Sequence, residues 1–89
     1  MNRAGAEMIA ATALGVVAGD PQRLGLFLAL SGIGPETLRG AAAQPEFLLA
    51  VLDFVIGDDD LVVAVARAAD TAPANVVSAR DMLAGPTPG

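Results

Sequence analysis

Proline placement is the feature that most constrains how this 89-residue chain can fold. Pro21, Pro35, Pro45 and Pro73 each stand at the start of a helix-forming run. Proline suits the first position of a helix because its φ angle is already helical and its missing N–H would have no intrahelical partner there. The four prolines therefore predict four separate helix starts.

Glycines supply the complementary signal, since Gly19, Gly32, Gly57 and Gly85 each follow an apolar run, where a left-handed C-terminal cap is expected. The Val-rich stretches are short and lack alternation, so no strand is predicted. We expect one helical domain over residues 1–85 and a flexible tail at 86–89. The fold class is all-α, a compact bundle of about six short helices with the predicted bounds 4–18, 21–31, 35–43, 45–56, 59–70 and 73–84.

The predicted helices differ in how much apolar surface they must bury. In helix 45–56 every position after Pro45 except Glu46 and Asp53 is apolar, so we expect this helix to be central and enclosed by its neighbours. Helix 21–31 is also apolar on two sides. A domain of this size can hardly cover two such helices. The apolar surface left uncovered favours a protein partner or a homo-oligomer. The alternative is that the remaining short helices cover both.

The last predicted helix has a simpler pattern. It carries one polar stripe and one apolar stripe, as an element on the outside of a bundle does. The polar stripe is Asn75, Ser78 and Asp81, and the apolar stripe is Val76, Ala79 and Leu83.

The absence of Cys, His, Lys, Trp and Tyr restricts the chemistry available. The ligands typical of zinc, haem and iron–sulfur centres are missing, and so are most activated nucleophiles and general bases. Asp58, Asp59 and Asp60 are consecutive, whereas calcium loops alternate their oxygen ligands, so we interpret them as the N-cap and first turn of a helix. We expect no enzyme, no metal and no cofactor.

The stretch 30–39, LSGIGPETLR, resembles the helix-hairpin-helix motif of DNA-binding proteins. The resemblance implies that amides near Gly32 and Gly34 could approach a phosphate, with Arg39 close by. Glu36 would place a carboxylate beside that phosphate, and the net charge of −5 repels nucleic acid. The competing interpretation, a plain connection between two helices, is the one we adopt; DNA binding stays open as an alternative.

Asp53 is the remaining candidate functional residue, because it lies mid-helix between Leu52 and Phe54. An unpaired carboxylate buried there would be costly. A structural role predicts a contact with an arginine or an exposed position; a functional role predicts a carboxylate in a ligand pocket, in an enzyme or small-ligand carrier, or in a partner interface. The candidate arginines are Arg23, Arg39 and Arg67.

The sequence also bears on cellular location. The apolar region 47–66 is interrupted by Asp53 and by the acidic run at 58–60, whereas a membrane span needs about 20 mostly apolar residues. The weakly hydrophobic N-terminal stretch contains Glu7, which argues against a secretory signal. We therefore expect a cytoplasmic protein that does not enter a membrane.

Several segments together resemble a family of short, uncharacterised helical proteins of alphaproteobacteria, known only as a domain of unknown function. The matching segments are DPQRL at 20–24, LR at 38–39, PEFL at 45–48 and VLDF at 51–54. The resemblance implies a helical, cytoplasmic bacterial protein. It implies no activity and no site residues.

Overall fold

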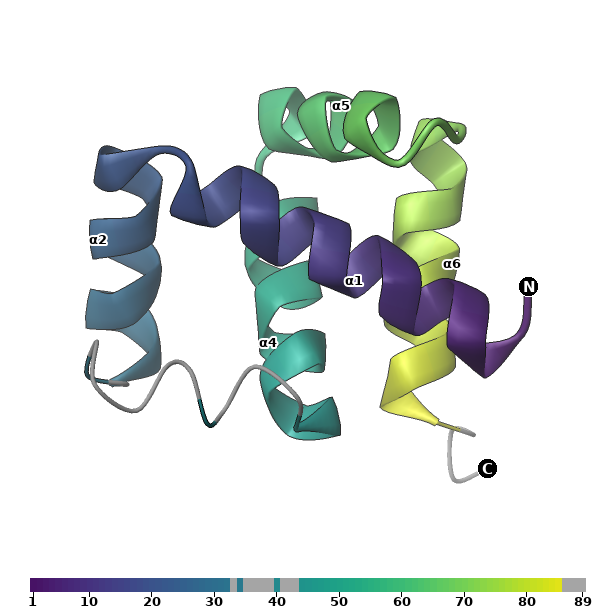
Figure 1. Cartoon of the computed structure of the whole chain (residues 1–89), viewed down its shortest axis with the longest axis horizontal. Helices are drawn as coiled ribbons and strands as arrows, with labels where there is room; N and C mark the ends of the chain where they lie inside the picture. The colour runs from purple at the N-terminus through teal and green to yellow at the C-terminus, as the bar shows by residue number, and fades with distance from the viewer. Residues whose placement is uncertain (33, 35–39, 41–43, 86–89) are drawn as a thin grey trace.

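The computed structural model describes residues 1–32, 34, 40 and 44–85, and these residues form five helices and no strand (Figure 1). The all-α prediction is confirmed, and three helices have the predicted bounds. Apart from residue 40, the predicted helix at 35–43 lies outside the described residues, and so does the predicted tail at 86–89. The helices are α1 (Arg3–Ala18), α2 (Pro21–Ser31), α4 (Pro45–Ile56), α5 (Asp59–Ala68) and α6 (Pro73–Ala84).

The helix starts follow the local chemistry of the sequence. Pro21, Pro45 and Pro73 each occupy the first turn of a helix, as predicted. The Asp20 carboxylate accepts hydrogen bonds from two backbone N–H groups of α2, at 3.1 and 3.3 Å. Asp58 accepts one from the first turn of α5, at 3.2 Å, which confirms its predicted capping role. Each such cap stabilises its helix by roughly 1 kcal/mol.

The helix ends agree with the prediction less well. Gly32 adopts the expected left-handed conformation with φ of 74°. Gly85 also has a positive φ, 81°, but with an extended ψ. Gly19 and Gly57 remain right-handed, with φ of −76° and −79°, so the prediction is wrong for them. The residue after each is already the N-cap aspartate of the next helix, and the chain makes these two corners without a left-handed residue.

Helix α5 ends two residues before the predicted position. Its last residue is Ala68, and Asp70 takes the left-handed conformation with φ of 55°. The N–H of Thr71 bonds to the carbonyl of Ala66 at 2.9 Å, and the N–H of Asp70 bonds to that of Arg67 at 3.2 Å. This is the hydrogen-bond pattern of a Schellman cap with aspartate in the place usually held by glycine.

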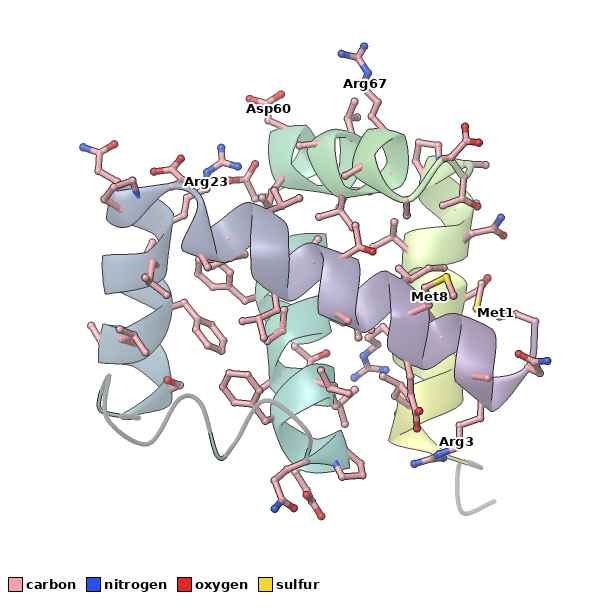
Figure 2. The ribbon with its side chains drawn as sticks, in the orientation of Figure 1. Met1, Arg3, Met8, Arg23, Asp60 and Arg67 are labelled. Carbon is pink, nitrogen blue, oxygen red and sulfur yellow. The ribbon has the colours of Figure 1, made fainter. Side chains whose placement is uncertain are left out.

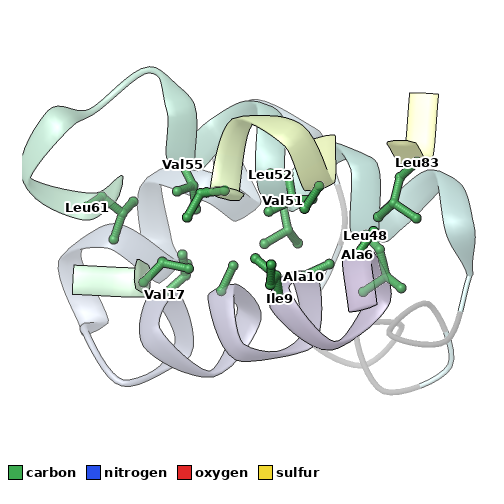
Figure 3. Close-up of a cluster of buried hydrophobic side chains, with 14 of the residues drawn as sticks. Ala6, Ile9, Ala10, Val17, Leu48, Val51, Leu52, Val55, Leu61 and Leu83 are labelled. Carbon is green, nitrogen blue, oxygen red and sulfur yellow. The ribbon is translucent and has the colours of Figure 1, made fainter. Parts of the chain in front are cut away.

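Helix α1 crosses the molecule and packs against the other four described helices (Figure 1). Its buried stripe is rich in alanine: Ala6, Ala10 and Ala13 are fully buried, beside the larger side chains of Ile9 and Val17. Small residues let the neighbouring helices approach closely but contribute little apolar area each. Larger residues from the other helices fill the rest of the core (Figure 3).

Helix α4 also contacts the other four described helices, a property that it shares with α1. Its predicted enclosure on all sides is wrong. Asp53 is exposed, and Ala50 and Phe54 are only half-buried. Described residues of α2 and α4 line an open hollow, so this side of α4 is not fully covered by another described helix.

Helix α6 matches its predicted pattern fully. The apolar stripe of Val76, Ala79 and Leu83 is buried and the polar stripe faces solvent. None of the helices in the described part of the chain is long and apolar enough to cross a membrane.

Candidate functional site

Asp53 lies on the open side of α4 and is bonded to Arg80 of α6. The Nε atom of Arg80 donates a hydrogen bond to Oδ1 of Asp53 over 2.7 Å. The Asp53 side chain is 47% exposed. The structural role predicted for Asp53 was a contact with an arginine or an exposed position, and Asp53 has both. The arginine is neither Arg23 nor Arg67, and Arg39 lies outside the described residues.

Arg80 forms ion pairs with two carboxylates, those of Asp53 and Asp81. Its Nη1 atom lies 3.3 Å from Oδ1 of Asp81, the next residue on α6. The hydrogen bond with Asp53 raises the pKa of the Arg80 guanidinium above its ordinary value, and Asp81 adds to this shift. Arg80 is therefore a permanent cation between two acids, and the group of three carries one net negative charge.

An apolar hollow of about 300 Å³ opens beside Asp53, between α2 and α4. Two aromatic rings form part of its wall. We call this feature the α2–α4 hollow; it is lined by Phe27, Leu30, Ser31, Ala50, Asp53 and Phe54.

The three phenylalanines of the chain form one cluster, and two of them, Phe27 and Phe54, line the hollow. The ring of Phe27 meets those of Phe47 and Phe54 edge to face, at centroid distances of 5.7 and 5.4 Å. Such pairs contribute about 0.5–1.5 kcal/mol beyond the area that they bury. Phe27 is the one fully buried side chain of α2, so this cluster is the main apolar anchor of that helix.

A second, polar anchor holds the start of α2. Arg23 is half-buried, and its guanidinium lies 3.5 Å from the carboxylate of Asp20 and 3.5 Å from that of Asp58. One arginine thus links the N-cap residues of α2 and α5; Arg23 is labelled in Figure 2. With α2 fixed at these points, the side that faces away from the bundle is left uncovered by the other described helices.

That uncovered side of α2 is apolar. Leu26 is 54% exposed and Leu30 is 71% exposed, and Gly25 and Ala29 beside them are also exposed. We call these four residues the α2 face. None of them carries a charge, and Leu30 belongs both to the α2 face and to the wall of the hollow. Helix 21–31 therefore exposes apolar surface that the other described helices do not cover, as its sequence pattern predicted.

A family model described as Protein of unknown function (DUF3572) matches residues 3–86. The chain belongs to this family. No curated protein and no solved structure matches it. Family membership confirms that the resemblance seen in the sequence was to a domain of unknown function, and it assigns no activity to the DUF3572 chain.

The other candidate residues of the DUF3572 chain are not brought together by the part of the structure that is described. Gly32 caps α2, and its N–H bonds to the carbonyl of Leu28 at 3.0 Å. Gly34 is half-buried, and Arg39 lies outside the described residues. The hairpin interpretation of this turn stays a prediction.

A second and larger hollow, of about 550 Å³, lies between the start of α1 and the end of α6. Its lining mixes two methionines with charged and polar side chains, including Arg3 and Asp81. Among the residues described, no group of three or more His, Cys, Asp or Glu side chains could hold a metal ion.

Two features of the site were missed at the level of sequence. Arg80 lies at the edge of the buried stripe of α6, and Asp53 lies at the edge of the buried stripe of α4. These matching positions were the signal in the sequence that could have paired the two residues. Phe47 and Phe54 are seven residues apart, which places them on one side of α4. Nothing in the sequence pointed to Phe27 as the ring that packs between them.

Proposed function

We propose that this DUF3572 chain is a protein-interaction or assembly module and that its docking surface is the α2 face with the adjacent α2–α4 hollow. The observation that carries the proposal is the position of Leu30, 71% exposed at the edge of an open apolar hollow. Covering a leucine of this kind contributes up to about 1.5–3 kcal/mol to a complex.

Leu26 strengthens the argument because it makes the exposed apolar surface continuous. It stands four residues before Leu30, so the two side chains lie on the same side of α2. A single exposed leucine is ordinary on a protein surface, whereas a ridge beside a hollow is typical of a groove that receives a partner. Leu26 and Leu30 are therefore the residues that we expect a partner to cover.

The proposal is tested by site-specific photocrosslinking in living cells. The full-length chain carries benzoylphenylalanine in place of Leu30, and a control carries it in place of Met8 of α1. Met8 is a matched control because its side chain is also 71% exposed. We expect a defined protein adduct from position 30 and none from position 8. The proposal fails if position 30 gives no adduct, or only the adducts that position 8 also gives.

A small-ligand carrier that uses Asp53 is the second candidate, and one observation favours it. The Asp53 carboxylate lines an apolar hollow with two aromatic rings. The size of the hollow is at the lower end of ligand pockets, and Arg80 already occupies one oxygen of the carboxylate. The test is a screen of cationic and neutral metabolites for a thermal shift of the native protein. A shift that Asp53→Asn abolishes would favour a carrier, and the absence of any shift would count against it.

A further inference from the structure

We infer that the occupant of this surface is a second copy of the chain, docked about a two-fold axis so that the leucine ridge of each copy enters the hollow of the other. The inference rests on the proposed function and goes beyond it by naming the partner. Three properties of the surface support it: a ridge that lies beside a hollow, the lack of charge on the α2 face, and an arginine of the same copy that is bonded to Asp53.

The shape is self-complementary. The ridge of Leu26 and Leu30 projects from α2, and the hollow formed with Ala50 and Phe54 of α4 lies directly beside it. A two-fold rotation exchanges the two copies, so a surface that holds both a ridge and a neighbouring hollow can match itself. Gly25 has no atom within 4 Å of the place that a Cβ would occupy, so a second backbone can come close to α2 there.

The charge distribution selects this surface for contact between copies. Each copy carries a net charge of −5, so two copies repel each other wherever acidic faces meet. The α2 face is uncharged, whereas each of the other described helices exposes at least one carboxylate: Glu7 on α1, Glu46 on α4, Asp60 on α5 and Asp81 on α6. A partner attracted by charge would be basic and would bind those acidic faces instead.

Among the described residues that line the hollow, Asp53 is the one carboxylate, and Arg80 of the same copy is bonded to it. The hydrogen bond of 2.7 Å from Arg80 holds a cation against it. When a second copy covers the hollow, Asp53 keeps this partner and needs no cation from the other chain. The contact can therefore form between two identical acidic proteins.

The inference is tested by light scattering after size exclusion, over about a hundredfold range of protein concentration around the micromolar Kd expected of a modest interface. We expect the wild-type mass to rise towards twice the 8.9 kDa of one chain. Leu30→Glu should remain at the single-chain mass, because it places a carboxylate in the contact. Met8→Glu adds the same charge at an equally exposed position and should behave as the wild type. Circular dichroism of both variants verifies that the helices are intact.

Salt dependence gives a second, independent readout. Raising the salt from about 0.05 M to about 0.5 M shortens the Debye length and screens the repulsion between copies, so self-association should strengthen or stay constant. A basic partner would be released by the same change.

A wild type that stays at the single-chain mass throughout overturns the inference, and so does a dimer that Met8→Glu dissociates while Leu30→Glu does not. If the wild type is monomeric and position 30 still crosslinks to a different protein, the inference fails and the proposed function stands. If position 30 gives no adduct at all, both fail.

Discussion

Arg80 and Asp53, 27 positions apart in the sequence, meet at 2.7 Å and join α6 to the open side of α4. Arg80 also reaches Asp81, so two acids share one cation and the group keeps one net negative charge. The bond does two things: it ties two helices of the core together, and it sets the charge at the edge of the α2–α4 hollow.

Removing the cation should therefore cost more stability than removing one acid. Arg80→Gln leaves Asp53 and Asp81 facing each other without a counter-charge, while Asp53→Asn leaves the Arg80 contact with Asp81 intact. We expect Asp53→Asn to lower the Tm slightly and Arg80→Gln to lower it by several degrees more. The measurement is thermal unfolding followed by circular dichroism, since the chain has no Trp or Tyr to report by fluorescence. In about 1 M salt the difference should shrink, because charges are then screened beyond roughly 3 Å. Equal losses in the two variants would contradict the shared role of Arg80.

The alanine stripe of α1 sets how closely the other helices approach. Ala10 is fully buried and Ala11 beside it is exposed. We expect Ala10→Leu to reduce the free energy of unfolding by about 1–3 kcal/mol, because three extra carbons must fit where helices already touch. Ala11→Leu should change it by less than about 0.5 kcal/mol. Urea unfolding at equal protein concentration measures both. If the two variants had the same midpoint, α1 would not be packed as described.

Asp70 holds a backbone conformation that suits glycine better. Its φ of 55° lies in the left-handed region, which costs most L-residues about 1–2 kcal/mol. Its carboxylate also lies at the C-terminal end of α5, where negative charge is unfavourable. We expect Asp70→Gly to stabilise the fold by about 1 kcal/mol, which raises the Tm by about 4–8 °C in a domain of this size.

Two companion variants separate the backbone effect from the charge. Asp70→Asn removes the charge but keeps a side chain that tolerates the left-handed region, and Asp70→Ala removes the charge and tolerates that region poorly. The expected order of Tm is Gly above Asn, Asn above the wild type, and Ala lowest. A Gly variant no more stable than the Asn variant would show that Asp70 is not strained.

Features that depend on neighbouring residues, such as helix starts and caps, were predicted from the sequence. Proline in the first turn of three helices and the Asp58 cap depend only on residues next to each other, and both were predicted. Asp53 was predicted to meet an arginine, but the wrong ones were named, because which helix lies beside α4 depends on packing across the whole core.

The candidate surface was predictable only in part. The pattern of helix 21–31 showed more apolar surface than a small domain could cover, but not that Leu26 and Leu30 would be the residues left exposed. That outcome depends on where Phe27 and Arg23 anchor α2, through contacts with the distant residues Phe54 and Asp58. Contacts of this kind leave no signal in the spacing of residues along the chain.

The stability of this protein should not depend on pH over the neutral and moderately alkaline range. The sequence has no His, Cys, Tyr or Lys, so it has no side chain whose ordinary pKa lies between about 5 and 11. The pKa of Arg80 is raised, chiefly by its hydrogen bond with Asp53. A cation with a raised pKa in the folded state stabilises the fold at every pH below its unfolded pKa, and this contribution is lost only as the pH rises through the folded value, which is strongly alkaline.

We therefore expect urea unfolding, followed by circular dichroism, to give one constant free energy of unfolding from pH about 6 to about 9.5. Arg80→Gln should give a lower value that is equally flat. One proton taken up or released on unfolding would produce a slope of about 1.4 kcal/mol per pH unit. A slope of that size within the range would contradict the prediction, because it would show that another group takes up or releases a proton on unfolding.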